Sequence, residues 1–352
     1  MSANSPYDVV IVGAGLSGAL VASTLAAEGQ QVVVLEAAQS LGGTVRRQPG
    51  LALLGTPTPF IGLIDDIGAE KAHTLWELTS DNLVRLEILL DQLGVASEKP
   101  GSLRLATDSR QSELFRASAE QLQTYGYDVA LEDGSQYEEL VALSTHDDIV
   151  FDPQDLISRL LDQENIILEL GAEVYATSDR PDGSVAVWAH NQYLWADKVI
   201  FANGIHATRF NSQLAAALQP VTVHTVVFNN VKEPERPLVL DTGHICFLPY
   251  QDRGYLTGWG EKEDDLIERL GAVAEQLCPD AVVHERFTTR IACTADHLPV
   301  VGQLPGAPNI TFVNGLGPFG LNLAMVATEE LAALVLEDRA PELFSLERFA
   351  NP

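Results

Sequence analysis

The chain opens with an apolar run that is broken by glycines and followed by helical periodicity. Tyr7–Val12 predicts a buried strand, and a second apolar run, Gln31–Glu36, follows a helix-length segment. Between the two runs stands Gly13-x-Gly15-x-x-Gly18. A strand, a glycine turn, a helix and a second strand that ends in a carboxylate are typical of a dinucleotide-binding unit. We therefore predict a β-α-β unit over residues 6–36.

The glycines have separate expected tasks in such a unit. The first allows a tight turn, the second lets the backbone approach a pyrophosphate, and the third lets helix and strand pack closely. The first helical N–H groups, at Leu16 and Ser17, then face the phosphates. Glu36 can bind both ribose hydroxyls, which favours a cofactor without a 2′-phosphate. A glycine-rich turn in some other α/β protein is the alternative, and it leaves Glu36 unexplained.

The rest of the chain alternates helical and strand-like patterns. Periodic apolar positions predict helices over residues 70–95, 112–125, 153–163 and 263–277. Short apolar runs predict strands over residues 101–106, 166–169, 171–176, 184–188, 193–195 and 198–204. Three further runs, Val223–Phe228, Cys246–Pro249 and Gly254–Trp259, predict an antiparallel sheet that forms the floor of a substrate cavity.

Two later glycine-rich segments distinguish a flavin from a nicotinamide cofactor. The loop Leu41–Gly50 is glycine-rich and basic, and a flavoprotein can use its backbone and cations near the isoalloxazine ring. A surface turn with two solvated arginines is the alternative. Gly315-x-Gly317-x-x-Gly320 precedes an apolar helix expected from about Leu321 to 336, so its N–H groups can face an electron-rich ring. The alternative there is a helix that only packs closely against a strand.

Composition narrows the possible partners. The formal net charge of −28 repels phosphate backbones and anionic lipid, so nucleic acid and membrane surfaces are poor candidates. No basic leader or membrane-length apolar stretch is visible, and the three cysteines include no CxxC pair. We therefore expect a reducing, cytoplasmic location with no disulfide framework and no metal site. The oligomeric state stays open.

Together these segments resemble the D-amino-acid oxidase superfamily of FAD-dependent oxidoreductases, which includes glycine oxidase and monomeric sarcosine oxidase. The resemblance rests on the N-terminal fingerprint, the Gly43–Gly50 loop, the Ala202–Gly204 turn and the Asp296-x-Leu-Pro-x-x-Gly302 segment. The segment from Thr294 is most similar to the oxidase domain of the bifunctional enzyme that makes 5-methylaminomethyl-2-thiouridine in tRNA. The acidity of this chain argues against a tRNA substrate.

The resemblance implies an α/β fold, with a Rossmann-like FAD-binding domain of the glutathione-reductase-2 type interleaved with an α+β substrate domain. We expect the FAD domain in residues 1–70, 145–215 and 286–352, and the substrate domain in 71–144 and 216–285. It also implies non-covalent FAD. The expected FAD-binding residues are Gly13, Gly15, Leu16, Ser17, Gly18, Glu36, Gly43, Thr44, Arg47, Gln48, Val174, Ala202, Asn203, Gly204, Gly315, Gly317, Gly320, Leu321 and Asn322.

The implied reaction oxidises the CH–NH bond of a small amino acid or secondary amine. Hydride passes to flavin N5, an imine forms, and O₂ or another acceptor reoxidises the flavin, so no side-chain base is required. Many members clamp the substrate carboxylate with an arginine five residues before the aspartate. Ile291 occupies that place here, and Arg290 needs a local bulge to reach it. Arg47 is the second candidate cation.

Other departures from the family pattern concern the substrate pocket. Cys246 replaces a pocket tyrosine, Glu261 replaces a methionine, and Pro318 replaces an arginine. With Tyr250 they complete the expected substrate-binding residues. They favour an amine or a basic amino acid over glycine. A flavin-binding protein without catalysis and an FAD-dependent 2-hydroxy-acid dehydrogenase remain the alternatives.

Overall fold

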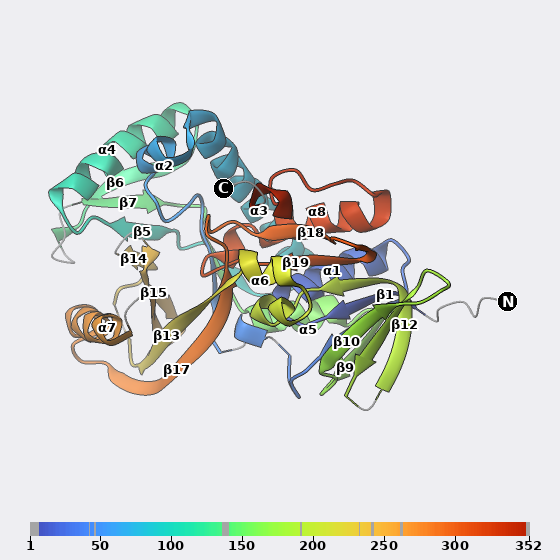
Figure 1. Cartoon of the computed structure of the whole chain (residues 1–352). Coiled ribbons are helices and arrows are strands. Elements are labelled where there is room, and N and C mark those ends of the chain that lie inside the picture. Colours follow the sequence, from blue (N-terminus) through green and yellow to red (C-terminus); the bar gives the residue numbers. More distant parts are fainter. Residues whose placement is uncertain are drawn as a thin grey trace.

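The structure is a computed structural model that describes residues 7–41, 43–45, 47–135, 141–190, 192–231, 233–240, 243–260 and 263–349, with only the backbone at Glu263. Two large sheets dominate it (Figure 1). One is mostly parallel and lies toward the right of Figure 1, and the other is mostly antiparallel and lies toward the left. The α/β class that the sequence predicts is therefore confirmed.

The parallel sheet carries the predicted β-α-β unit at its centre. Its parallel strands run in the order β9-β2-β1-β12-β19, with β18 antiparallel on β19 and the β10–β11 pair on the first half of β12. The strand bounds are β1 Tyr7–Val12, β2 Val32–Glu36, β9 Ile166–Leu170, β10 Val174–Asp179, β11 Val185–Ala189, β12 Gln192–Phe201, β18 Val300–Leu304 and β19 Ala307–Asn314.

Helices cover this sheet because their apolar faces are buried against its central strands. One core joins α1 with α3, α5 and α8, and a second core fills the opposite face under β10 and β11. Both faces of the central strands are thus buried, which explains their nearly continuous Val, Ile and Leu content. These helices are α1 Leu16–Ala27, α3 Ala69–Leu93, α5 Pro153–Leu161 and α8 Ala324–Glu337.

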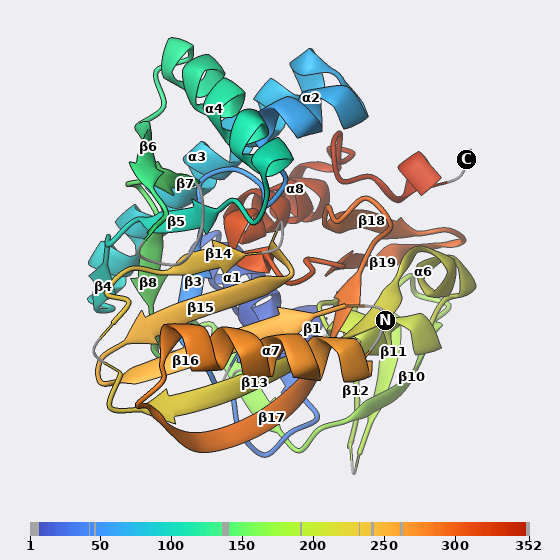
Figure 2. The ribbon, with the colours of Figure 1, turned by 90° about the vertical axis from the view of Figure 1, so that its left-hand side faces the viewer.

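The second sheet has the order β17-β13-β16-β15-β14-β5-β7-β6. Helix α7 (Glu263–Leu277) lies across one face of it, where Leu266 and Leu270 pack against Gly258 of β16 (Figure 2). The opposite face is free to line a cavity. The strand bounds are β5 Ser102–Leu105, β6 Val129–Asp133, β7 Val141–Thr145, β13 Gln219–Asn229, β14 Leu238–Leu240, β15 Ile245–Tyr250, β16 Arg253–Trp259 and β17 Val282–Cys293.

Smaller elements connect the two sheets. Helices α2 (Phe60–Ile67) and α4 (Ser109–Thr124) pack together above β6 and β7 in Figure 1. A three-stranded sheet joins β3, β8 and β4, and short turns of 3-10 helix flank the strand ends. The remaining bounds are β3 Gly50–Ala52, β4 Ser97–Glu98, β8 Ile149–Phe151, α6 Ser212–Ala217, η1 Gly43–Val45, η3 Gly204–Arg209, η5 Gly320–Asn322 and η6 Leu346–Phe349.

Two predicted element boundaries differ from the structure. The strands expected at 193–195 and 198–204 are one strand, β12, which ends at Phe201. The closing helix begins at Ala324, because Gly320–Asn322 first forms a 3-10 turn. β17 is a single strand paired with β13 and contains residues 285 and 286, and the expected division into two domains there stays a prediction. In the described part of the chain, no helix is both long and apolar enough to cross a membrane.

Candidate functional site: a dinucleotide cavity between the sheets

The glycine turn after β1 is built on close backbone contacts. Gly13 has φ +110°, and a Cβ there would lie 2.7 Å from the carbonyl oxygen of Ala202. A Cβ on Gly18 would lie 2.0 Å from the carbonyl oxygen of Gly13. A Cβ on Gly15 would meet nothing within 4 Å, and this residue lines the cavity described below. Two of the glycines therefore allow the turn to pack, and the third leaves room for a ligand.

Glu36 ends β2 beside this turn. Its carboxylate accepts the N–H of Ala14 at 2.9 Å and the N–H of Ala38 at 2.8 Å. Each carboxylate oxygen has a second lone pair, so the side chain can still accept a ribose hydroxyl. Val174, at the start of β10, lines the same end of the cavity as Ala172 and Glu173. This end has the composition expected for the adenosine half of a dinucleotide.

A cavity of about 560 Å³ runs from this turn to the antiparallel sheet. It brings together most of the residues that the sequence suggested. The expected residues that line it are Gly13, Gly15, Leu16, Ser17, Glu36, Gly43, Thr44, Gln48, Val174, Ala202, Asn203, Gly204, Cys246, Arg290, Gly315, Gly317, Gly320 and Leu321.

Five expected residues are not among those that line the cavity. Gly18 packs against Gly13, and Asn322 holds the backbone of Leu53 and Gly55 through its side-chain amide. The structure thus gives Gly18 a packing contact and Asn322 a positioning contact, and their expected binding of the cofactor stays a prediction. Arg47 lines a neighbouring depression, Tyr250 lies at the end of β15, and Glu261 lies outside the described residues.

The basic loop after β2 is fastened onto the antiparallel sheet. Gln48 accepts hydrogen bonds from the hydroxyls of Thr225 at 3.3 Å and Thr257 at 3.5 Å. Arg47 forms an ion pair with Glu285 and lies 4.3 Å from the ring centroid of Phe287. These contacts hold the loop where its backbone can line the cavity, while the guanidinium of Arg47 is used on β17. Gly43 completes the arrangement by packing close to Gly15.

The register of β17 bears directly on Arg290. Pairing with β13 is continuous from Cys293 to Glu285, so the bulge that Arg290 would need is not present in this segment. Strand alternation places Arg290 on the face opposite Thr289 and Ile291. Its side chain is exposed, and the residue lies at the rim that the cavity shares with a neighbouring depression. The pairing therefore favours Ile291 over Arg290 as the side chain on the cavity face.

The wall formed by the antiparallel sheet is uncharged. Alternate residues of β15 and β16 turn away from α7 and line the cavity: Cys246, Leu248, Tyr255, Thr257 and Trp259. Phe319 joins them, with its ring 5.2 Å from that of Trp259 in an edge-on contact. Burial raises the pKa of the Cys246 thiol to about 12, so it remains protonated at neutral pH. This wall offers hydroxyl, thiol and aromatic groups.

Two buried charges beside this wall could not be found from the sequence. Arg104 is only 2% exposed and Asp148 is fully buried. Arg104 donates to the carbonyl oxygen of Leu54 at 2.6 Å, and Asp148 accepts the N–H of the same residue at 2.6 Å. Both residues therefore hold the backbone of Leu54 in place. The preceding residue, Leu53, lines the cavity. Arg104 lies on β5 and Asp148 lies in the turn between β7 and β8, and neither residue belongs to a local motif.

Burial affects the ionisation of both groups. It raises the pKa of Asp148, although Arg104 and three hydrogen-bond donors act in the opposite direction. It lowers the pKa of Arg104, but a guanidinium remains protonated in proteins. Arg104 on β5 pairs in register with Val239 on β14, which pairs with Cys246 on β15. A positive charge is thus fixed in the same cross-strand row as Cys246.

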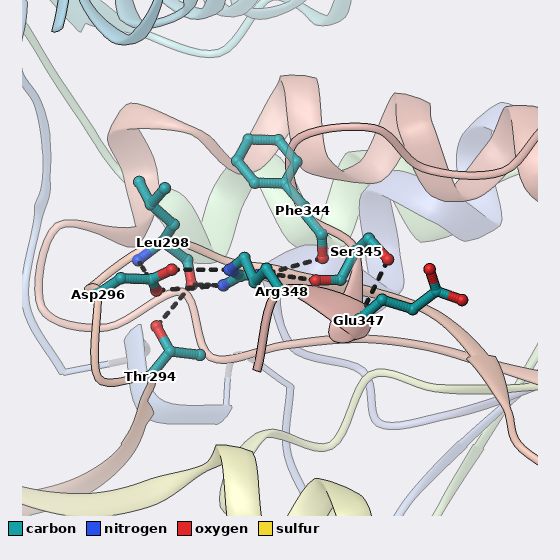
Figure 3. A network of polar contacts seen from close by, with 7 residues as sticks. All are labelled: Thr294, Asp296, Leu298, Phe344, Ser345, Glu347 and Arg348. Carbon is teal, nitrogen blue, oxygen red and sulfur yellow. Dashed lines mark hydrogen bonds and ion pairs between the residues drawn. The ribbon is translucent and has the colours of Figure 1, made fainter. Parts of the chain in front are cut away.

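The Asp296 turn links the cavity to the end of the described chain. Arg348 donates to both carboxylate oxygens of Asp296, at 2.7 and 3.2 Å, and also to the carbonyl oxygens of Leu298, Phe344 and Ser345 (Figure 3). Within the turn, the hydroxyl of Thr294 donates to Leu298. The turn follows β17, whose Ala292 accepts the N–H of Gly317, so the network supports the second glycine turn.

The fold and cavity define the class of protein. A β-α-β unit with its three glycines and terminal Glu36, facing a cavity closed by an antiparallel sheet, is a dinucleotide-dependent oxidoreductase architecture. The family model described as FAD-dependent oxidoreductase, DAO, matches residues 8–334. This chain belongs to that family.

Individual relatives agree with this assignment. The tRNA 5-methylaminomethyl-2-thiouridine biosynthesis bifunctional protein MnmC of Caulobacter sp. (strain K31) is 28% identical over 99% of this chain, which spans 57% of that protein's length. Among solved structures, glycine oxidase from Geobacillus kaustophilus has a TM-score of 0.79 at 18% identity, with 97% of each chain covered. L-proline dehydrogenase from P. horikoshii has a TM-score of 0.81 at 16% identity, covering 99% of this chain and 98% of that one.

FAD is the cofactor of this family, and the residues present fit it. The ligand-facing Gly15 leaves a Cβ-sized space open at the start of α1, where backbone N–H groups can meet a diphosphate. Glu36 is placed for a ribose. The loop fastened by Gln48 and the turn at Gly315–Gly320 border the cavity toward the uncharged wall, where the flavin would contact substrate.

Proposed function

We propose that this FAD-dependent oxidoreductase oxidises the CH–NH bond of a secondary amine or small amino acid to an imine. When bound, FAD supplies the acceptor for the hydride. The observation that carries the proposal is the uncharged wall of Cys246, Leu248, Tyr255, Thr257 and Trp259. A neutral amine can be buried there at little cost, whereas burying an unpaired carboxylate or ammonium costs several kcal/mol. The reacting end of the substrate should therefore enter uncharged.

The task of the chain in this reaction is positioning. Thr257 can orient the amine by hydrogen bonding, and Trp259 with Phe319 can hold an apolar substituent and exclude water. No side-chain base is needed if the amine binds neutral. This proposal favours amines with apolar substituents over glycine, whose carboxylate would lie against the wall.

Anaerobic flavin bleaching tests the proposal. Holoenzyme would be mixed with N-methylbenzylamine, sarcosine, glycine, lysine and lactate, and the loss of flavin absorbance followed. We expect the fastest bleaching with N-methylbenzylamine and none with lactate. Bleaching by lactate alone would favour a 2-hydroxy-acid dehydrogenase. If none of these compounds bleaches the flavin, even with the wall variant Trp259→Ala as a wider pocket, a flavin-binding protein without this catalysis is favoured.

The substrate is proposed to be a free small molecule. The relative named for tRNA biosynthesis raises the possibility of an amine carried on RNA, but a net charge of −28 opposes binding of a polyphosphate backbone. We expect no retention of tRNA by the holoenzyme in a filter-binding assay at low salt. Saturable retention would contradict this part of the proposal.

FAD is proposed to be held without a covalent bond. Cys293, near where the resemblance to sarcosine oxidase would place a flavin-linked cysteine, is 4% exposed. Burial raises the pKa of its thiol to about 11, so little nucleophilic thiolate forms at neutral pH. Acid precipitation should release all the flavin into the supernatant, and yellow colour retained in the washed pellet would contradict the prediction.

A further inference from the structure

A second depression, of about 810 Å³, adjoins the FAD cavity and shares Gly43, Thr44, Ile205, His206, Arg209 and Arg290 with it. It lies between the loop after β2, the turn after β12 and the end of β17. Arg47 and Arg209 join Arg290 and His206 in its lining. We call it the cationic depression.

The composition of this lining differs from that of the whole chain. Asp and Glu outnumber Lys and Arg by 49 to 21 in the sequence, yet the described residues that line the depression include three arginines and no carboxylate. A surface patch drawn from this composition would be negative. The lining of the depression instead carries only cationic side chains among its charged groups, and such a lining can attract an anion.

The ionic partners of these arginines are weak or missing. Arg47 pairs with Glu285, and Arg209 pairs with Glu173 at 3.2 Å, where both side chains are about 60% exposed. Exposed pairs of this kind contribute little free energy, because water competes for both charges. As far as the structure describes the chain, Arg290 has no carboxylate within salt-bridge distance. These cations can therefore exchange their partners for a stronger acceptor.

The remaining polar groups suit a phosphate. Thr44 also lines the depression, and Thr288 lies on the same face of β17 as Arg290. Guanidinium groups bind phosphate oxygens in pairs, and hydroxyls can donate to the oxygens that remain. A single carboxylate would be satisfied by one arginine, whereas a phosphate dianion has the charge and the acceptor oxygens to engage more than one guanidinium.

We propose that the cationic depression binds a phosphate group carried by the amine substrate while FAD occupies its own cavity. This assignment rests on the proposed function for the amine end, because the depression meets the cavity at its rim and the uncharged wall receives the reacting end. The other source of the same chemistry is the diphosphate of FAD itself. The two sources differ in one respect: a site for the substrate must remain open in the holoenzyme.

Titration calorimetry with inorganic pyrophosphate as the probe tests this assignment. FAD-saturated holoenzyme at low ionic strength should bind one pyrophosphate. Arg290→Gln and Arg209→Gln should each weaken that binding by about tenfold, the effect of losing one charge-assisted hydrogen-bonding group. Arg290→Lys keeps the charge without the planar fork and should weaken binding less than Arg290→Gln. Arg339→Gln, at a position where the side chain is 67% exposed and outside the depression, is the matched control and should bind as the parent does.

Each other outcome overturns the proposal. Binding to the apoprotein but not to the holoenzyme would assign the depression to the FAD diphosphate. No binding to either form, or equal binding by the parent and both glutamine variants, would remove the site. Flavin absorbance and circular dichroism confirm that each variant is folded before titration. The readout is heat of binding without turnover, so a failure of amine oxidation in the bleaching assay would be seen separately.

Discussion

The absence of a Cβ atom at Gly18 allows the first glycine turn to pack closely. A methyl group at Gly18 would lie 2.0 Å from the carbonyl oxygen of Gly13, a distance that backbone atoms cannot accept without moving. Gly18 therefore supports the FAD site by packing, although the sequence motif counts it with the binding residues. The same motif contains Gly15, where the space is open.

The variant Gly18→Ala tests this difference. We expect it to lose bound flavin and to lower the free energy of unfolding by about 1–3 kcal/mol, as overpacking does. The control is Gly271→Ala in α7, where a Cβ meets nothing within 4 Å and should stabilise the helix by about 0.5–1 kcal/mol. Flavin absorbance after purification and urea unfolding measure the two effects. Full flavin content in Gly18→Ala would contradict the packing argument.

The residues that sequence reasoning found at this scale are those with local signals. Gly13, Gly15 and Glu36 have a fixed spacing that follows from one β-α-β unit. Arg104 and Asp148 have no such spacing, because they come together only when β5 and the segment after β7 meet at Leu54. A buried arginine on a strand also contradicts the usual pattern of exposed charge. Only the folded chain reveals that pair.

At the scale of elements, strand register controls which side chain faces the cavity. β17 keeps its alternation through Thr289, Arg290 and Ile291, so the chain places isoleucine where the family resemblance expects the arginine clamp. The sequence showed Arg290 one residue away from the position of the family arginine. It could not show which side chain faces the cavity, because a bulge depends on the partner strand β13.

The variant Ile291→Arg should create the missing clamp. An arginine on the cavity face can bind a carboxylate with two hydrogen bonds, worth about 1.5–3 kcal/mol, so flavin bleaching by sarcosine at low concentration should accelerate about tenfold or more. Arg290→Ile in the same background removes the cation on the other face and should not reverse that gain. No change with sarcosine in Ile291→Arg would contradict the assigned register.

The clamp between Arg348 and Asp296 is a second element-scale feature. Burial alone would raise the pKa of Asp296, but the hydrogen bonds and the charge of Arg348 lower it by more. The pKa of Asp296 therefore lies below its ordinary value. A carboxyl group whose pKa is lower in the folded state than in the unfolded state stabilises the fold at pH values above its unfolded pKa of about 3.9. That stabilisation is lost as the pH falls through the folded-state pKa. The pair therefore stabilises the fold at neutral pH and fades below about pH 4.

Arg348→Gln should lower the free energy of unfolding at pH 7 by about 1–2 kcal/mol, a value reduced for the partial exposure of Asp296. The difference from the parent should shrink as the pH is lowered from 7 to 3, because protonation of Asp296 removes its charge-assisted pairing with Arg348. Urea unfolding at the two pH values measures it. Arg339→Gln, which removes an exposed pair with Glu337, is the control and should change little at either pH. An equal loss at pH 3 and pH 7 would show that packing rather than charge is responsible.

Element boundaries show where sequence patterns lose precision. The pattern divided β12 in two at Ala196–Asp197, but pairing with β1 and β11 continues across those residues. The closing helix was expected to begin at Leu321 but begins at Ala324, because the side-chain amide of Asn322 hydrogen-bonds the backbone of Leu53 and Gly55. In both cases a partner remote in sequence sets the boundary.

For the whole molecule, charge is the dominant surface property. A net charge of −28 produces self-repulsion that salt screens, since the Debye length falls from about 30 Å at 0.01 M to about 8 Å at 0.15 M ionic strength. The melting temperature of the holoenzyme should therefore rise by on the order of 5 °C between 10 mM and 0.5 M salt. Thermal unfolding in NaCl and in KCl measures it, and similar rises in both separate screening from a specific ion effect. A falling melting temperature would contradict this prediction.

The two sheets are joined by one unbroken strand. β17 begins beside β13 in the antiparallel sheet and ends at Ala292 and Cys293, which contact Gly317 and Leu316 of the second glycine turn. A hinge between the sheets would have to bend this strand and break its ladder. The uncharged wall and the turn that borders the FAD cavity are therefore expected to move as one rigid piece. Their separation is set when the chain folds, before any ligand binds.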